Sequence, residues 1–372
     1  MLSDRLIRIE KEASQFAKEV IFKKSEEMIS DSFPLDIWQQ LSDAGWLGVS
    51  LPKKYGGMGH GYAAMSIVGH ALASHGYNLG IVLSWMIHLA VARSFILNCG
   101  QKKQQDALIP QLASGKQTAV FAVSEPQTGA HPKFLKTRAR QQGNTYVLTG
   151  EKTFLTNGPI ADWFIVIAIT HEEANQKSFS AFLVPKQTDG LTITPLVIER
   201  LKPAPHCSIQ LTNCSIPATY LLGKKGTAYE DMVKPFREIE DMLMMGPITG
   251  ALTALLQITN VLLKTIHTEL SVTVMEDLGR LCSLIHTLRV LSYESAKKLD
   301  NPLRYQSIEA FPLSFRWIAL EAQNILDSIL NQKEIEIPHY LEILRQDVRF
   351  AAQIAMNATK IKFKKMGEMG IL

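Results

Sequence analysis

The amino-acid sequence predicts an α+β protein with three consecutive domains: an N-terminal α-helical domain over residues 1–117, a middle β-barrel or sandwich domain over residues 118–225, and a C-terminal helical bundle over residues 226–372. Two changes in the period of the apolar residues predict this order. A helical repeat gives way to short β-type runs near Gln117 and returns near Gly226. The length agrees, because 372 residues are too many for a single core.

The first domain shows the helical repeat in four stretches, separated by turn residues at Pro34, at residues 53–61 and at residues 98–100. These stretches cover residues 6–22, 37–47, 63–72 and 81–97. We therefore expect an all-helical beginning of the chain.

The middle domain contains short runs of the β-branched and aromatic residues that favour strands. The pairs Gly143-Asn144 and Asp189-Gly190 and several prolines separate them, at spacings typical of a small sandwich or barrel. The expected strands cover residues 119–123, 145–148, 163–169, 179–184, 191–193 and 208–211.

The last domain returns to long helical segments joined by short connections, which is typical of a bundle of roughly four antiparallel helices. The segments cover residues 229–263, 272–298, 303–331 and 340–365.

One part of the last domain, residues 242–263, carries no charge over a length close to the ~20 residues that span a bilayer. Pro247 and two amide side chains interrupt it, so we interpret it as a helix buried in the bundle rather than a transmembrane span. Gly246 and Gly250, spaced as GxxxG, then predict close contact with another helix.

Composition excludes several classes of protein. The 39 basic and 35 acidic residues are spread along the chain, whereas nucleic-acid binding needs clustered positive charge. The four cysteines lack metal-ligand or paired spacing, which argues against structural zinc and a disulfide framework. The cysteine spacing therefore predicts no bound metal. The chain opens with a charged helical pattern instead of an apolar signal, so we expect a cytoplasmic location.

Several segments together resemble one family. Residues 121–129 read FAVSEPQTG, and residues 145–168 read TYVLTGEKTFLTNGPIADWFIVIA. Three further stretches, residues 45–59, 100–116 and 216–226, match the first-domain loop, the linker before the β-domain and the exit from it. These motifs resemble the acyl-CoA dehydrogenase family, in order, over about residues 30–265.

The resemblance implies a fold, a reaction and partners. It implies the acyl-CoA dehydrogenase fold and the α,β-dehydrogenation of an acyl-CoA, in which a carboxylate takes the α-proton and FAD accepts the β-hydride. It also implies an electron-transfer flavoprotein or similar acceptor, and a homo- or hetero-oligomer.

The resemblance places the flavin ring against the β-domain. Ser124 would offer a hydroxyl and a backbone donor, Phe154 an aromatic face, and Thr156 a hydroxyl near the reactive flavin nitrogen. The alternative is that Phe154 is a core residue and that the two hydroxyls satisfy strand ends. The full set of predicted cofactor contacts is Phe121, Val123, Ser124, Phe154 and Thr156.

The catalytic base is predicted at Glu240. The Glu-Gly-Thr loop that supplies the base in many family members is absent, but residues 235–247, PFREIEDMLMMGP, resemble the segment that supplies it in others. The following methionines would raise the carboxyl pKa. The alternative is a solvated carboxylate at a helix start, beside Glu238 and Asp241; the family usually has arginine at the latter position.

The sequence departs from the family pattern at other positions. Ala130, followed by His131, occupies a substrate-binding position where the family has serine. Lys364 replaces a glutamine that meets the flavin's diphosphate or adenosine half, the Arg-x-x-Phe-Gly stretch after Leu263 is missing, and the chain stops where the family continues.

These departures leave three functions open. The first is a complete dehydrogenase. The second is a catalytically impaired subunit that binds acyl-CoA or completes a hetero-oligomer with another acyl-CoA dehydrogenase. The third, an acyl-carrier or membrane-associated lipid-binding protein, rests on the apolar segment alone.

Overall fold

The computed structural model describes residues 3–30, 32–174, 176–265, 270–301, 310–332, 335–354 and 356–368. The chain folds into two compact units. One comprises Met1–Ile29, Tyr62–Val82 and Asp241–Leu372, and the other comprises Ser30–Gly61 and Leu83–Glu240.

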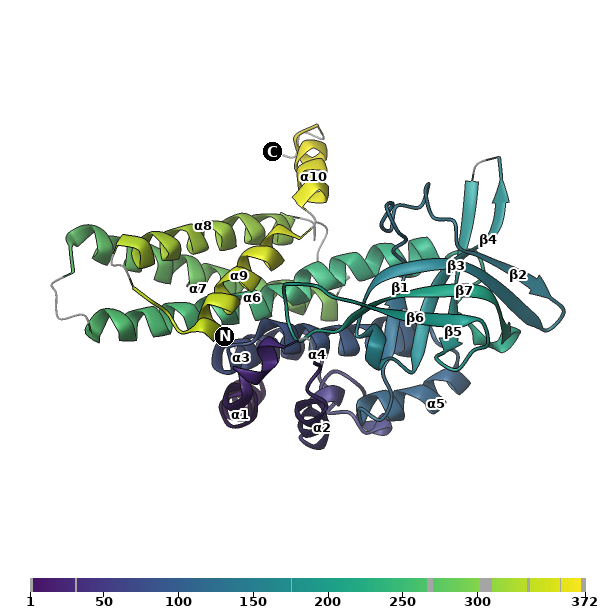
Figure 1. The fold of residues 1–372 in the computed structure, drawn as a ribbon, viewed down its shortest axis with the longest axis horizontal. Helices are drawn as coiled ribbons and strands as arrows, with labels where there is room; N and C mark the ends of the chain where they lie inside the picture. The colour runs from purple at the N-terminus through teal and green to yellow at the C-terminus, as the bar shows by residue number, and fades with distance from the viewer. Residues whose placement is uncertain are drawn as a thin grey trace. The chain divides into compact units, whose positions relative to one another are not determined.

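The expected N-terminal helices are present as α1 (Asp4–Phe16), α2 (Leu35–Asp43), α3 (Tyr62–Gly76) and α4 (Leu79–Val91) (Figure 1). Two of them continue as π-helical turns, η1 (Ala17–Ile21) and η6 (Ala92–Leu97). The stretch 100–116, which resembles a linker, contains another helix, α5 (Lys102–Ala113). Its start is stabilised by a capping box between Gln101 and Gln104.

The middle of the chain forms one sheet of eight described strands in the order β6-β7-β3-β2-β4-β5-β8, with β1 parallel to β4. A cluster of buried apolar side chains, including Leu148, Phe164 and Phe182, forms its core. The strands are β1 (Ala119–Ala122), β2 (Arg138–Gln142), β3 (Thr145–Thr156), β4 (Trp163–Glu173), β5 (Gln176–Pro185), β6 (Leu191–Leu196), β7 (His206–Pro217) and β8 (Leu221–Leu222).

All six strand predictions are confirmed, but β2 and β8 were not predicted. The sequence of β2, RARQQ, is polar and mostly exposed, so it gives no apolar alternation to detect. The predicted strand at residues 145–148 was too short, because β3 continues through a polar stretch to Thr156. That extension carries two of the predicted flavin contacts.

The C-terminal helices are η9 (Tyr229–Val233), α6 (Lys234–Thr265), α7 (Val272–Asp300), α8 (Ala310–Gln332), α9 (His339–Gln353) and α10 (Met356–Glu368). The prediction of a single helix over residues 340–365 was wrong. The backbone of Ile354 is extended, with ψ of 132°, and this interrupts the helical hydrogen-bond ladder after Gln353. The beginning of the helix predicted over residues 303–331 lies outside the described residues.

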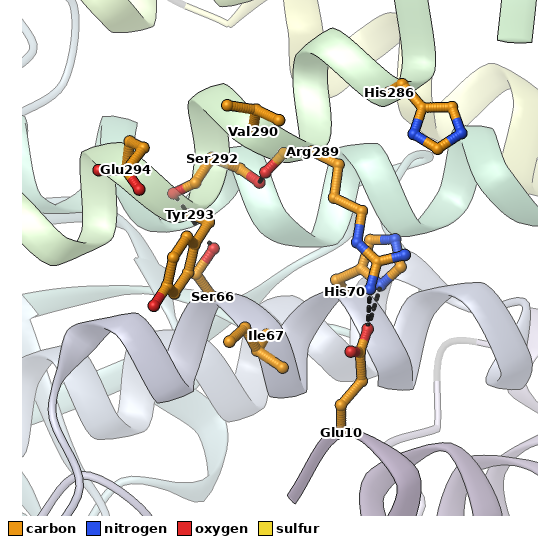
Figure 2. A pocket seen from close by; sticks show the side chains of 10 residues that line it. All are labelled: Glu10, Ser66, Ile67, His70, His286, Arg289, Val290, Ser292, Tyr293 and Glu294. Atoms are coloured by element: carbon orange, nitrogen blue, oxygen red, sulfur yellow. Dashed lines mark hydrogen bonds and ion pairs between the residues drawn. The ribbon is translucent and has the colours of Figure 1, made fainter. Parts of the chain in front are cut away.

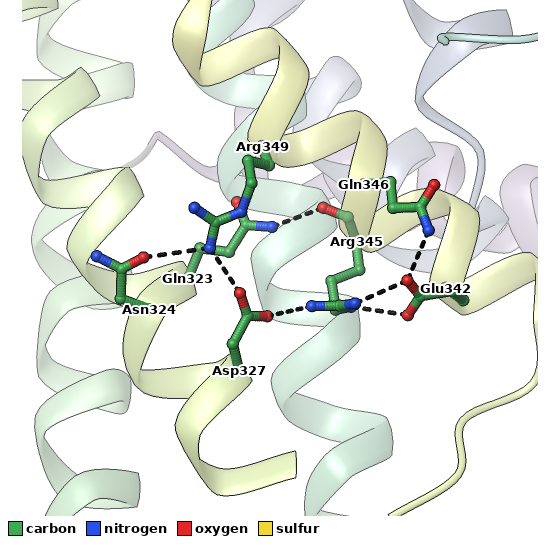
Figure 3. A network of polar contacts seen from close by, with 7 residues as sticks. All are labelled: Gln323, Asn324, Asp327, Glu342, Arg345, Gln346 and Arg349. Carbon is green, nitrogen blue, oxygen red and sulfur yellow. Dashed lines mark hydrogen bonds and ion pairs between the residues drawn. The ribbon is translucent and has the colours of Figure 1, made fainter. Parts of the chain in front are cut away.

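Helices α8 and α9 are joined by a polar network that the sequence did not reveal (Figure 3). Asp327 on α8 accepts hydrogen bonds from Arg345 at 2.6 Å and from Arg349 at 2.5 Å, both on α9. Arg345 also forms two 2.7 Å hydrogen bonds with Glu342. One carboxylate that pairs with two guanidinium groups thus sets the register between the two helices.

The predicted close approach at Gly246 and Gly250 is confirmed. A Cβ atom on Gly246 would lie 2.4 Å from the carbonyl oxygen of Ser66, and one on Gly250 would lie 2.2 Å from that of His70. Both carbonyls belong to α3, so the two glycines allow α6 and α3 to pack backbone to backbone.

Two helical stretches of the described chain are long and apolar enough to cross a membrane, Leu79–Leu97 and Tyr229–Thr265. In their most apolar windows, 94% and 78% of the residues are buried inside the protein. This burial fits the interpretation of residues 242–263 as a core helix, and Leu79–Leu97 is buried in the same way.

The glycine contact leads to a test of stability. Gly250→Ala is expected to lower the free energy of unfolding by about 1–3 kcal/mol, because the new methyl group meets a backbone carbonyl that cannot rotate away. Gly279→Ala is the matched control, since a Cβ there meets no atom within 4 Å and alanine favours α7 by about 0.5–1 kcal/mol. Urea denaturation measures both. Equal changes in the two variants would contradict the proposed contact.

Candidate active site

An aromatic cluster joins three elements of one compact unit. Phe121 on β1 lies 4.5 Å from Phe95 and 5.1 Å from Phe236 between ring centroids, and Phe95 lies 4.7 Å from Phe236. Phe95 belongs to the π-helical turn η6 and Phe236 to α6. Such π turns are frequent at functional sites, because they shift the side chains that follow them. The cluster places the beginning of α6 against the predicted flavin segment.

Glu240 follows Phe236 by four residues on α6, so both side chains lie on the same face of the helix. That face contacts Phe121 through Phe236. Glu240 is partly buried and is not at a helix start, because the helical backbone begins at Tyr229 in η9. The interpretation as a solvated helix-start carboxylate therefore finds no support.

Asp241, the next residue, has a separate role. Its carboxylate lies 2.5 Å from the guanidinium group of Arg316 on α8 and 3.8 Å from the amine of Lys362 on α10. It therefore takes part in the packing of the C-terminal helices, rather than forming a solvated acidic cluster with Glu240.

A buried ion pair holds the loop that follows β1. The carboxylate of Glu125 accepts hydrogen bonds from the backbone amides of Lys136 at 2.7 Å and Thr137 at 2.9 Å. It also accepts one from the amine of Lys152 at 2.9 Å, and this amine donates a second bond to the Val123 carbonyl at 3.0 Å. The ion pair thus links β3 to the predicted flavin segment.

The pKa values of this pair reflect burial and mutual attraction. Burial lowers the pKa of Lys152 to about 8, although the charge of Glu125 acts in the opposite direction. Burial alone would raise the pKa of Glu125, but the charge of Lys152 and the hydrogen bonds lower it below its ordinary value. Both residues lie inside the family motifs, yet neither was predicted to have a role. Sequence alone could not show that two distant charges meet in the core.

Val123 and Ser124 are both partly buried next to this pair. The backbone amide of Thr153 on β3 donates to the Ser124 carbonyl at 2.9 Å. The Ser124 hydroxyl has no hydrogen-bond partner within the described part of the chain. The segment is therefore held through its carbonyls, and the serine hydroxyl is available to a ligand.

Phe154 is exposed on the surface of β3. Its relative exposure is 66%, and its φ of +57° lies in the left-handed region, which is unfavourable for a bulky residue. It lies at the irregularity between Lys152 and Leu155, where β3 loses its regular pairing with β7. The alternative that Phe154 is a core residue is wrong. The bulge instead presents an aromatic face outward, at a cost in backbone energy.

Thr156 ends β3 and is partly buried. Its hydroxyl oxygen lies 3.1 Å from Nε2 of His206, which begins β7. The next residue, Asn157, donates from its side chain to the Ser84 carbonyl at 2.8 Å and from its backbone to the Pro205 carbonyl at 2.7 Å. These hydrogen bonds hold the end of β3 in place, and the Thr156 hydroxyl has His206 as its partner.

Ala130 is buried, with 8% of its surface exposed. Its carbonyl accepts a 2.9 Å hydrogen bond from the hydroxyl of Tyr229, which lies in the π-helical turn η9. The alanine methyl group cannot form the hydrogen bond that a serine would offer, so only the backbone at this position is polar. The neighbouring His131 lies 5.0 Å from Phe134 between ring centroids.

The predicted cofactor contacts have the chemistry that a planar aromatic cofactor needs. The exposed ring of Phe154 offers a stacking surface, and the hydroxyls of Ser124 and Thr156 offer polar contacts to a ring edge. These residues fit a flavin. Among the residues that the structure describes, no group of three or more His, Cys, Asp or Glu side chains could hold a metal ion.

A cavity of about 250 Å³ lies in the other compact unit, and no predicted site residue lines it (Figure 2). At its edge, Glu10 of α1 forms a 2.6 Å ion pair with Arg289 of α7, and it lies 3.6 Å from Nδ1 of His70. Burial lowers the pKa of His70 to about 3, so this histidine is neutral and the Glu10 charge is balanced by Arg289. The cavity is lined by Glu10, Ser66, Ile67, His70, His286, Arg289, Val290, Ser292, Tyr293 and Glu294.

Comparison with protein families gives two matches. The family model for the acyl-CoA dehydrogenase N-terminal domain matches residues 3–116, and the one for the acyl-CoA dehydrogenase middle domain matches residues 120–214. Together the two matches cover more than half of the chain.

Three curated relatives illustrate the similarity. An acyl-CoA dehydrogenase of Bacillus subtilis (strain 168) is 31% identical over 60% of this chain and 59% of its own length. The mitochondrial isovaleryl-CoA dehydrogenase of Pongo abelii is 28% identical over 69% and 62%. The L-prolyl-[peptidyl-carrier protein] dehydrogenase of Pseudomonas fluorescens is 32% identical over 51% and 50%. The chain thus spans less than two thirds of the length of these relatives.

Two solved structures share the fold over almost their whole length. The prolyl acyl carrier protein oxidase AnaB has a TM-score of 0.88 at 22% identity, with all of both chains covered. Butyryl-CoA dehydrogenase from Megasphaera elsdenii has a TM-score of 0.87 at 18% identity, with 99% of this chain and 98% of that chain covered. The two likenesses establish the order of helical, sheet and helical domains.

Proposed function

The chain belongs to the acyl-CoA dehydrogenase family, and we propose that it is an FAD-dependent enzyme that oxidises the α,β bond of an acyl-CoA thioester. One observation carries the proposal. Glu240 lies one helical turn after Phe236, whose ring contacts Phe121 at the beginning of the predicted flavin segment. The predicted base and the predicted flavin segment are thus connected through Phe236.

In the proposed reaction, the carboxylate of Glu240 takes the proton from the α-carbon of the acyl group. The β-carbon loses a hydride, and the two electrons left at the α-carbon form the new double bond. Bound FAD supplies the hydride acceptor. A base and an acceptor on either side of the substrate allow both C–H bonds to break without a free carbanion in water.

The chain's own residues prepare this reaction. Phe95, Phe121 and Phe236 form an apolar cluster one helical turn before Glu240, and such a cluster would help to exclude water from the reacting carbons. The Glu125–Lys152 pair holds the segment that carries Ser124, whose hydroxyl would orient the ring edge. Phe154 would cover the ring face, and Thr156 would meet the reactive nitrogen.

Electrons leave such a site through a second protein, and we propose an electron-transfer flavoprotein or a similar acceptor. The acyl-CoA is proposed as the substrate, because acyl-CoA dehydrogenases are among the relatives. A second candidate is an acyl group carried on a carrier protein, which the 32% identical prolyl-carrier dehydrogenase favours. The alternative to both substrates is that the chain is a catalytically impaired subunit, and the experiment below distinguishes it from them.

The visible absorption spectrum of the purified full chain tests the proposal. We expect a flavin band that bleaches when an acyl-CoA is added, and the same experiment with a carrier-bound acyl group separates the second candidate. Bleaching by neither substrate would overturn the dehydrogenase proposal. If flavin binds only when another acyl-CoA dehydrogenase subunit is added, the chain is a component of a hetero-oligomer.

Substitution of Phe154 is predicted to raise the stability of the flavin-free protein and to weaken FAD binding. Phe154→Gly is expected to raise the free energy of unfolding of the flavin-free protein by about 1 kcal/mol, because glycine adopts the left-handed backbone without strain. It is expected to weaken FAD binding about tenfold, because the stacking surface is lost. Urea denaturation and flavin titration measure the two effects. A loss of stability in this variant would contradict the strained, ligand-facing role.

A further inference from the structure

His206 and Thr156 face each other across a strand pair. Thr156 ends β3 and His206 begins β7, and the two residues are paired in the antiparallel register. The Thr156 hydroxyl oxygen lies 3.1 Å from Nε2 of His206, and Nδ1 of the same ring lies 2.9 Å from the Ala204 carbonyl. The backbone amide of Asn157 donates to the Pro205 carbonyl at 2.7 Å, which holds the two strand ends together.

These contacts determine where the hydrogens lie. A carbonyl oxygen can only accept, so Nδ1 of His206 must carry a hydrogen and donate it to Ala204. His206 is buried, and this lowers its pKa, although the bond to Ala204 acts in the opposite direction. The ring is therefore neutral near neutral pH, and Nε2 carries only a lone pair. Thr156 must then donate its single hydroxyl hydrogen to Nε2.

The hydroxyl of Thr156 thus has a fixed direction. Its hydrogen is used inside the protein, and only its oxygen lone pairs remain for a ligand. No hydrogen-bond partner of Thr156 other than His206 is present among the described residues. A ligand that offers a hydrogen at this position is favoured over one that offers a lone pair.

We propose that His206 is a positioning residue that fixes the Thr156 hydroxyl as a hydrogen-bond acceptor and thereby favours reduced over oxidised FAD. The inference rests on the proposed function, which places Thr156 at the reactive flavin nitrogen. That nitrogen is a bare acceptor in the oxidised ring and carries a hydrogen in the reduced ring. An oxygen that can only accept therefore discriminates in favour of the reduced form.

The test compares the flavin reduction potential in four proteins: wild type, His206→Ala, Thr156→Val and the double variant. In His206→Ala the threonine hydroxyl is free to donate, so the ratio of affinities for reduced and oxidised FAD is expected to fall about tenfold. For a two-electron couple this is a decrease of about 30 mV in potential. In the Thr156→Val background, His206→Ala is expected to have no further effect. His206→Gln, which can present an oxygen at the same place, is expected to restore most of the wild-type potential.

A second measurement needs no flavin. Nitrogen-15 NMR of the flavin-free full chain is expected to show His206 neutral with its hydrogen on Nδ1. A hydrogen on Nε2, or an equal potential shift from His206→Ala with and without the Thr156 hydroxyl, overturns the inference and leaves the proposed function intact. Failure of the wild type to bind FAD overturns the proposed function and this inference with it.

Discussion

Glu240→Gln is expected to lower the rate of acyl-CoA-dependent flavin reduction by about 10²–10⁴-fold, because glutamine cannot accept the α-proton. The size of glutamine is almost the same, so the helix face that contacts Phe121 through Phe236 remains in place. Flavin content and the affinity for acyl-CoA are expected to change little. Stopped-flow measurement of the decrease in flavin absorbance gives the rate.

Glu238→Gln is the matched control for this substitution. It removes the same charge from the same helix, two residues earlier, where the side chain points away from the face shared by Phe236 and Glu240. Its rate of flavin reduction is expected to remain within about threefold of the wild type. If both variants reduce flavin at the wild-type rate, the base is another residue.

Lys152→Met is expected to lower the free energy of unfolding by about 3–5 kcal/mol, because it leaves the buried Glu125 carboxylate without its cation. The lysine side chain is fully buried, so water cannot replace the lost interaction. The Val123 carbonyl also loses its donor. The variant is therefore expected to bind FAD weakly as well, since the loop that carries Ser124 is no longer held. Chemical denaturation and flavin titration measure the two losses.

The double variant Lys152→Met/Glu125→Leu is the control, since it removes both charges and is expected to recover much of the stability.

The pH dependence of the free energy of unfolding tests the same ion pair. The folded-state pKa of Glu125 in the wild type is lowered, so its contribution to stability is present above the unfolded value of 4.5 and is lost as the pH falls through the folded value. In Lys152→Met the deficit is expected to narrow on acidification, because protonation removes the unpaired charge. A constant deficit from neutral to acid pH would contradict this account.

Several parts of the fold could be read from local sequence. Helical periodicity predicted α3, α4 and α6, and the GxxxG spacing of Gly246 and Gly250 correctly indicated a backbone contact. These signals are local, because the repeat of apolar residues is set by the geometry of a single helix. The polar strand β2 gave no such signal, because its pairing with neighbouring strands and not its own apolar pattern makes it a strand. The helix break after Gln353 gave none either, because it depends on the extended backbone of a single residue, Ile354.

The active site divides in the same way. By itself, the sequence determined the family motifs, and through them it predicted the flavin segment at residues 121–129 and the candidate base Glu240. Only the tertiary structure decided that Lys152 pairs with Glu125, that Phe154 faces outward on a strained bulge, and that His206 holds the Thr156 hydroxyl. The physical reason is that these hydrogen bonds and ion pairs join residues far apart in the chain. Which groups meet, and which of them donates the hydrogen, depends on burial and on three-dimensional neighbours that a local sequence pattern does not contain.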